Sequence, residues 1–135
     1  MKNKVSGMVM YLKMFLLCAA LYSPAHAASI SISDATTPNE NEFSQTVVVF
    51  MSSRQNLPIS LKFETLDGTA KAGQDYEAVS GKLVFEVGET VKAIRIPILP
   101  DRKAEDKETL IVKISDASTG VITDNEAIVY ITDDD

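Results

Sequence analysis

The sequence is poor in the side chains that most enzymes and transition-metal centres use. Its 135 residues contain one cysteine, one histidine and no tryptophan. Cys18 and His26 both lie within the first 27 residues, so residues 28–135 offer no thiol, no imidazole and no disulfide. A Ser-His-Asp triad, a cysteine nucleophile and a His/Cys zinc site are therefore excluded there. A hydrolase with paired carboxylates would need a sheltered pocket, which crowded loop acids do not provide. We expect no enzyme.

The start of the chain has the order of a secretory signal peptide. Lysines come first, an apolar run covers Met14–Leu21, and the small-x-small triplet "AHA" follows. The run is shorter than the ~20 residues that cross a bilayer. Two leucines precede Cys18 where a lipoprotein signal needs small residues. We expect a cleaved signal peptide, residues 1–27, and a secreted or periplasmic domain, residues 28–135, that can associate with the cell surface.

Negative charge dominates what remains after cleavage. The whole chain has a formal charge of −6, and the leader carries three lysines and no acid, so residues 28–135 carry −9. Such a domain repels nucleic acid and anionic membrane surfaces. We therefore expect no nucleic-acid partner and instead a protein or cell-surface partner. About 108 residues suffice for one domain with a modest core.

Apolar and polar residues alternate with a period of two through most of this domain, and no stretch has a helical period. Turn-forming residues separate the alternating runs. Pro97 lies inside one run, which predicts an edge or bulged strand there. The pattern predicts an all-β fold, a two-sheet antiparallel sandwich of about seven strands. The expected strands are 29–33, 45–51, 57–66, 82–85, 90–99, 108–115 and 126–132.

The acids are unevenly distributed between the two ends of such a sandwich. If successive strands reverse direction, twelve acids fall at one end and five at the other. The crowded end receives Glu40, Glu42, Asp67, Asp75, Glu77, Asp101, Glu105, Asp106, Glu108 and Asp133–Asp135. Two carboxylates about 4 Å apart repel by roughly 1 kcal/mol in water, and by more near a protein surface. The crowding therefore destabilises the fold unless a cation is present.

Calcium is the cation that suits this end. Ca²⁺ takes about 6–8 oxygen ligands with adaptable geometry, whereas Mg²⁺ retains its water and zinc prefers nitrogen or sulfur. Three segments supply candidate ligands by their spacing. These are Asp75 after a glycine-containing arch, Asp101, Glu105 and Glu108 around one loop, and Asp133–Asp135 after the last strand.

The same acids have simpler interpretations. Asp133–Asp135 can form a solvated tail. Asp75 can cap the backbone of its own turn. Glu105 and Glu108 can form ion pairs with basic residues of their loop, such as Lys107. These alternatives leave a metal-free structural module as the second interpretation.

The arch before Asp75 contains residues that we interpret as structural. Gly68 and Gly73 allow the chain a tight path. Tyr76 is expected to bury its ring and to hydrogen-bond its hydroxyl.

Four ordered motifs resemble the Calx-β domain family. They are "DGTAKAGQDY", "F-x2-GET" from Phe85, "IRIPILPDRKAEDKETL", and a last strand that ends in "ITDDD". The resemblance covers nearly all of Ser29–Asp135. It implies an immunoglobulin-like sandwich that binds Ca²⁺ at one end, as in modules of sodium–calcium exchangers, an integrin subunit and bacterial surface proteins. It also implies a role in adhesion, cell communication or matrix interaction.

The family's ligand pattern carries over to specific positions. Lys103 would supply a backbone carbonyl. The first ligand along the chain would be Glu40, with Asn39 or Glu42 as alternatives. Pro100-Asp101 stands where high-affinity members have paired aspartates, which implies fewer ions, weaker binding or none. Because the metal end faces the next domain in tandem arrays, a second chain could complete it and give Ca²⁺-dependent self-association. The implied ligands are Glu40, Asp75, Asp101, Glu105, Glu108, Asp133, Asp134 and Asp135.

Overall fold

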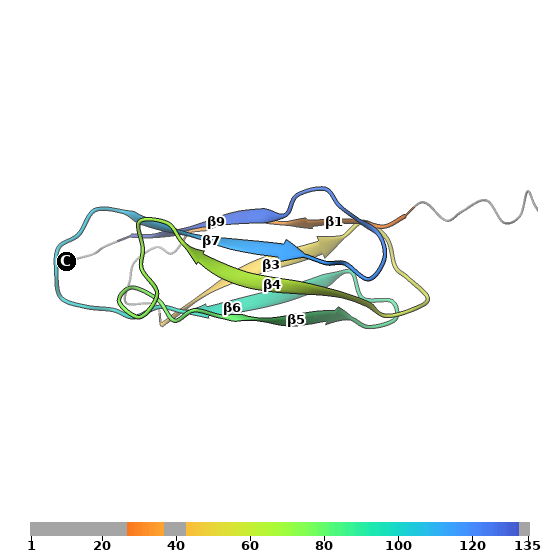
Figure 1. The fold of residues 1–135 in the computed structure, drawn as a ribbon, viewed down its shortest axis with the longest axis horizontal. Coiled ribbons are helices and arrows are strands. Elements are labelled where there is room, and N and C mark those ends of the chain that lie inside the picture. The colour runs from red at the N-terminus through yellow and green to blue at the C-terminus, as the bar shows by residue number, and fades with distance from the viewer. Residues whose placement is uncertain (1–26, 37–42, 133–135) are drawn as a thin grey trace, which may run out of the picture.

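A computed structural model describes residues 27–36 and 43–132, which form strands and loops only (Figure 1). All seven expected strands are present. The sheets also contain two additional strands of two residues each, β2 and β8. No helix within the described residues is long and apolar enough to cross a membrane. The strands are β1 (Ser29–Ile32), β2 (Ala35–Thr36), β3 (Ser44–Met51), β4 (Ile59–Asp67), β5 (Ser80–Phe85), β6 (Val91–Pro97), β7 (Glu108–Ser115), β8 (Val121–Ile122) and β9 (Glu126–Ile131).

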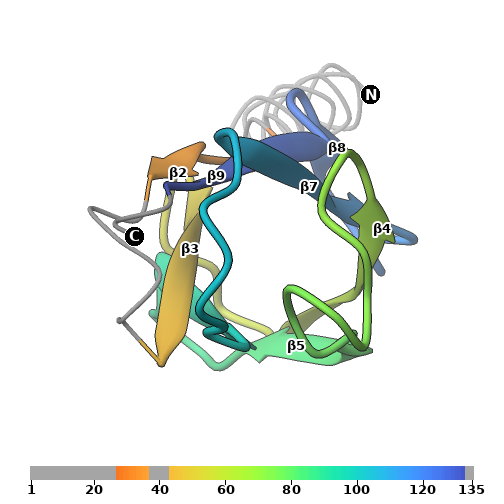
Figure 2. The same ribbon diagram turned by 90° about the vertical axis from the view of Figure 1, so that its left-hand side faces the viewer.

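The strands build two facing sheets, as the alternation predicts. One sheet has the order β6-β3-β1-β8, and the other has the order β2-β9-β7-β4-β5. The long pairs, such as β3 with β6 and β7 with β9, are antiparallel. Figure 2 views the sandwich from one end, with the strands of the two sheets arranged around a common interior. The all-β, two-sheet prediction is confirmed.

Two short pairs differ from the fully antiparallel prediction. β1 lies parallel to β8, and β2 lies parallel to β9. The second pair arises because the chain leaves one sheet after β1 and joins the other as β2. At this crossing the Asp34 Oδ1 accepts the Ile128 N–H at 2.8 Å. Segments of two residues are too short to be recognised from a period of two.

Within residues 27–36 and 43–132, the core contains twenty buried apolar residues, which both sheets contribute. In β7 the buried side chains are Leu110, Val112 and Ile114, which alternate with partly exposed neighbours as expected. Each large apolar side chain contributes roughly 1.5–3 kcal/mol when it is fully buried.

Pro97 confirms the edge-strand prediction. It is the last residue of β6, and among the described strands β6 pairs in its sheet with β3 alone. Proline has no N–H to donate to a second neighbour, so it is tolerated at this edge. Its carbonyl accepts the Glu77 N–H at 3.0 Å, and this bond connects β6 to the arch between β4 and β5.

Candidate metal centre

The β4–β5 arch, residues 68–79, carries Asp75, and two glycines allow its path. A Cβ on Gly68 would lie 2.4 Å from the carbonyl oxygen of Thr109, so only glycine permits this approach to β7. Gly73 has φ +85°, which side chains with a Cβ rarely adopt. Both glycines were expected to allow a tight turn, and both do.

Tyr76 connects the arch to the core. Its side chain is buried, and its hydroxyl donates to the Asp67 Oδ1 at 2.6 Å. Burial, together with the hydrogen bond to Asp67, raises the pKa of Tyr76 to about 12. The structural interpretation of Tyr76 is confirmed.

Hydrogen bonds between distant residues bring three acid-bearing segments together. The Leu99 N–H donates to the Asp75 carbonyl at 3.0 Å, which joins the arch to the β6–β7 connection. On the other side of the arch, the Ala70 N–H donates to the Thr109 carbonyl at 2.9 Å. The Thr109 N–H in turn donates to the Thr69 Oγ1 at 2.8 Å. Glu108, next to Thr109 at the start of β7, is thereby held beside the arch.

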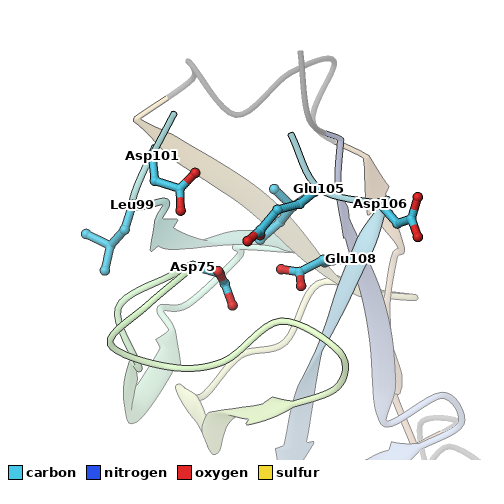
Figure 3. A pocket seen from close by; sticks show the side chains of 7 residues that line it. Asp75, Leu99, Asp101, Glu105, Asp106 and Glu108 are labelled. Atoms are coloured by element: carbon cyan, nitrogen blue, oxygen red, sulfur yellow. The ribbon is translucent and has the colours of Figure 1, made fainter. Parts of the chain in front are cut away.

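Asp75, Glu105 and Glu108 converge at this end (Figure 3). One carboxylate oxygen from each residue lies within 4.8 Å of the other two. Calcium–oxygen distances of about 2.3–2.6 Å place two oxygens on one ion at most about 5 Å apart. The three oxygens therefore lie close enough together to be ligands of one calcium ion.

Four more residues line the same pocket, namely Leu99, Asp101, Asp106 and Ile131. The pocket has a volume of about 10 Å³, which is the room for one water-sized particle. Asp106 points away from the other acids in Figure 3. The Asp101 Oδ1 accepts the Lys103 N–H at 2.7 Å, so this carboxylate also holds its own loop.

The electrostatics of the site favour a bound cation. Burial raises the pKa of the Glu108 carboxyl above its ordinary value of 4.5, and the negative charges of Asp75 and Glu105 raise it further. Asp101 adds to the same effect. The ionised form of Glu108 is thus disfavoured in the folded protein, and a nearby cation would remove this penalty.

Two of the simpler interpretations, the cap formed by Asp75 and the ion pairing of Lys107, can be compared with the structure. The Asp75 Oδ2 accepts the Lys71 N–H at 2.6 Å, so Asp75 does cap its own turn while it also faces the cluster. The Lys107 ammonium lies 4.2 Å from the centre of the Tyr130 ring. An interaction of that kind is a cation–π contact.

Part of the expected ligand set lies outside the described residues. Glu40, with its alternatives Asn39 and Glu42, belongs to this part, and so does Asp133–Asp135. Ile131 is the last residue of β9 and lines the pocket. The structure therefore brings Asp75, Asp101, Glu105 and Glu108 around one pocket and leaves the other expected ligands as predictions.

Sequence reasoning did not single out Leu99, Asp106 or Ile131 as pocket residues, nor Asp67 as the partner of Tyr76. For Leu99 and Ile131 the alternation predicts only a position in a strand. Asp67 and Asp106 were counted among the acids of this end. In the sequence, Asp67 stands directly before Gly68, and Asp106 stands directly after Glu105. These positions are the only sign that either residue lies near the site.

The fold and the acids at its end define a β-sandwich module with an oxygen-lined pocket. A sequence model of the Calx-beta domain matches residues 24–135. The chain belongs to the Calx-β domain family. This confirms the resemblance carried by the four motifs.

Sodium/calcium exchangers contain similar segments. Sodium/calcium exchanger 1 of Bos taurus is 39% identical over 70 residues, which cover 52% of this chain and 7% of the exchanger. Sodium/calcium exchanger 2 of Homo sapiens is 42% identical over 65 residues, which cover 48% of this chain and 7% of the exchanger. The matched segments are thus a small part of these relatives.

Solved structures agree with the fold. The apo-form Calx CBD1 domain superposes with a TM-score of 0.74 at 28% identity, covering 82% of this chain and 100% of that chain. A structure described as calcium binding domain CBD12 of CALX1.1 superposes with a TM-score of 0.71 at 26% identity, covering 78% of this chain and 46% of that chain. The immunoglobulin-like sandwich is confirmed.

Proposed function

We propose that this protein is a Ca²⁺-binding module and not an enzyme. The observation that carries the proposal is the convergence of Asp75, Glu105 and Glu108, whose oxygens lie within 4.8 Å of one another. The similarity to a structure described as a calcium binding domain supports it. When bound, the ion would offset the mutual repulsion of these carboxylates and hold the arch, the β6–β7 connection and β7 together.

The donor set favours calcium over other cations. The described ligands are carboxylate oxygens, which suit Ca²⁺, Mg²⁺ or Mn²⁺ and not zinc or copper. Calcium accepts irregular oxygen geometry, whereas magnesium demands a near-ideal octahedron. A cluster assembled from two loops and the start of β7 provides an irregular geometry more readily than an octahedron.

The affinity we propose is low. Pro100 removes one of the two carboxylates that the family pattern has at this point, and the Asp101 carboxylate is engaged by the Lys103 N–H. Extracellular calcium modules bind in the range of about 10⁻⁴–10⁻³ M, and we place this site there. A metal-free structural module is the second candidate. It is favoured by Pro100 and by the bond from Lys103 to Asp101, since both weaken the site.

We further propose that the module acts outside the cytoplasm, through a protein or cell-surface partner, in adhesion or cell communication. The leader-like residues 1–27 and the strong negative charge of the rest support this. The exported chain would meet millimolar calcium outside the cell, where a weak site is filled.

Thermal unfolding of residues 28–135 in EDTA, CaCl₂ and MgCl₂ tests the metal proposal. Calcium at 100 times its Kd adds ~2.7 kcal/mol, which raises the Tm by roughly 10 °C for a domain of this size. We expect a clear rise with calcium and a much smaller one with magnesium at equal concentration. Equal melting in EDTA and in 10 mM CaCl₂ would reject the calcium site and leave the metal-free module.

A further inference from the structure

Asp67 is an acid of the crowded end that does not line the pocket. It is the last residue of β4, directly before the arch. Its Oδ1 accepts two hydrogen bonds, one from the Tyr76 hydroxyl at 2.6 Å and one from the Ala72 N–H at 2.9 Å. Its carboxylate is therefore committed to the arch and not to the cluster of Asp75, Glu105 and Glu108.

The two donors to Asp67 stand on either side of Asp75. Ala72 and Tyr76 are themselves paired as a β-bridge, and the Gly73 N–H donates to the Tyr76 carbonyl at 2.8 Å. Asp67 thus closes a small loop, residues 72–76, by holding both of its ends. Asp75 is the fourth residue of this loop, so its backbone position depends on both anchors.

The side chain of Asp75 depends on the same anchors. Its Oδ2 accepts the N–H of Lys71, the residue directly before Ala72, at 2.6 Å. Its N–H donates to the Lys71 carbonyl at 2.9 Å. A shift of Ala72 would move Lys71, and with it the carboxylate of Asp75 that faces Glu105 and Glu108 in Figure 3.

Charge and burial make this anchor firm. The hydrogen bonds from Tyr76 and Ala72 hold the pKa of the Asp67 carboxyl below its ordinary value, so the group accepts as an anion at neutral pH. Charge-assisted hydrogen bonds are shorter and stronger than neutral ones. The Tyr76 ring is 1% exposed, so the donor cannot swing into solvent.

We infer that Asp67 is a positioning residue that acts through Tyr76 and Ala72 to hold the Asp75 carboxylate where it meets the cation. The inference rests on the proposed calcium function. It assigns the acids of this end to two tasks, since Asp75, Glu105 and Glu108 face the ion while Asp67 holds one of them in place. Partners of metal ligands that act in this way change metal affinity by about 10–100-fold when they are removed.

Calcium titrations of four variants of residues 28–135 test the inference. Tyr76→Phe removes the hydroxyl donor and keeps the ring, and Asp67→Ala removes the acceptor. Both are expected to raise the calcium Kd about ten-fold or more. Asp67→Asn removes the charge but keeps an acceptor oxygen, so it should lie between Asp67→Ala and the unaltered protein.

Glu77→Gln is the matched control for loss of charge. Glu77 is an exposed acid next to Tyr76 and does not line the pocket. Glu77→Gln should change the calcium Kd by less than about three-fold, because salt screens the interaction between an exposed charge and the ion. If Asp67→Ala, Asp67→Asn and Glu77→Gln all weaken binding equally, Asp67 acts only through its charge and the inference is wrong. Unchanged binding in both Asp67→Ala and Tyr76→Phe would also overturn it.

Amide hydrogen exchange in EDTA separates this inference from the calcium proposal. The Lys71 N–H, which donates to Asp75, should exchange about ten-fold faster in Tyr76→Phe, while the Ile114 N–H of the core keeps its protection. If the unaltered protein binds no calcium, the proposed function fails, and this exchange result alone decides whether Asp67 positions Asp75. Unchanged exchange at Lys71 would refute the positioning role. If Asp67→Ala does not fold, the calcium Kd and the Lys71 exchange rate of Tyr76→Phe decide the inference.

Discussion

Glu108 is the single residue at which the competing demands of folding and metal binding meet. It is half-buried at the start of β7, beside Asp75 and Glu105. Burial and these two carboxylates raise its pKa, so its charge opposes folding in the absence of a cation. The same charge is the one that a calcium ion would use.

Replacement of Glu108 by glutamine should therefore have opposite effects with and without calcium. In EDTA at pH 7, Glu108→Gln should raise the Tm by up to about 4 °C, since it removes repulsion of roughly 1 kcal/mol. In calcium, the same variant should lose the calcium-dependent rise. Differential scanning calorimetry in the two buffers measures both effects.

The stabilisation in EDTA should depend on pH in one direction. Because the folded-state pKa of Glu108 is raised, its contribution to stability is fully present below the ordinary value of 4.5 and is lost as the pH rises through the folded value. The gain from Glu108→Gln should thus be largest at pH 7 and vanish near pH 4. Glu126→Gln, at the opposite end of the sandwich, is the control. A gain that stays constant with pH would contradict this account.

At the scale of elements, the close approach of the β4–β5 arch to β7 decides where the acids stand. Gly68 allows this approach, because a Cβ there would lie 2.4 Å from the Thr109 carbonyl oxygen. The hydrogen bonds that Ala70 and Thr69 form with Thr109 depend on the same short distance. The arch and β7 therefore behave as one unit.

Gly68→Ala should separate this unit. The added methyl group meets backbone atoms that cannot move without breaking hydrogen bonds, so we expect a loss of about 1–3 kcal/mol of unfolding free energy. Gly81→Ala is the matched control, since its Cβ would meet only the Phe63 ring at 3.4 Å. Urea denaturation should show a clear loss for Gly68→Ala and little change for Gly81→Ala. Equal stability of the two variants would show that the arch tolerates the shift.

The strands and the existence of the arch were predictable at this scale, and the contacts that the arch makes with other segments were not. Alternation of Leu110, Val112 and Ile114 with more exposed residues identifies β7 because the period of two is a local property. The convergence of Asp75 with Glu105 depends on the bond between the Asp75 carbonyl and the Leu99 N–H, which no local pattern encodes. The two-residue segments β2 and β8 are too short for any periodic signal.

At the scale of the whole molecule, five acids of the described residues line one pocket at the same end of the sandwich. The β4–β5 arch, the β6–β7 connection and the end of β9 all lie there, as Figures 1 and 2 show. We propose that this end also mediates contact with a second copy when calcium is present, because an ion shared by two acidic surfaces would offset their repulsion. Calcium would then link two molecules that otherwise repel each other.

Sedimentation analysis of residues 28–135 tests this contact. We expect a monomer in EDTA and a calcium-dependent dimer at tens of micromolar protein, with Glu105→Gln shifting the equilibrium back toward the monomer. Magnesium at equal concentration controls for simple charge screening. A monomer in both EDTA and calcium would reject self-association through the acidic end.

The sequence by itself determined the class of the molecule: an acidic, all-β domain with an edge strand at Pro97 and oxygen ligands as its only means of holding a hard cation. Composition and a period of two suffice for this, because neither depends on contacts between distant residues. Only the tertiary structure decided that Asp75, Glu105 and Glu108 face one another, that Asp106 points away, and that Asp67 serves the arch. The three acids meet because the Leu99 N–H donates to the Asp75 carbonyl, and a bond between two such separate segments exists only once they have packed together.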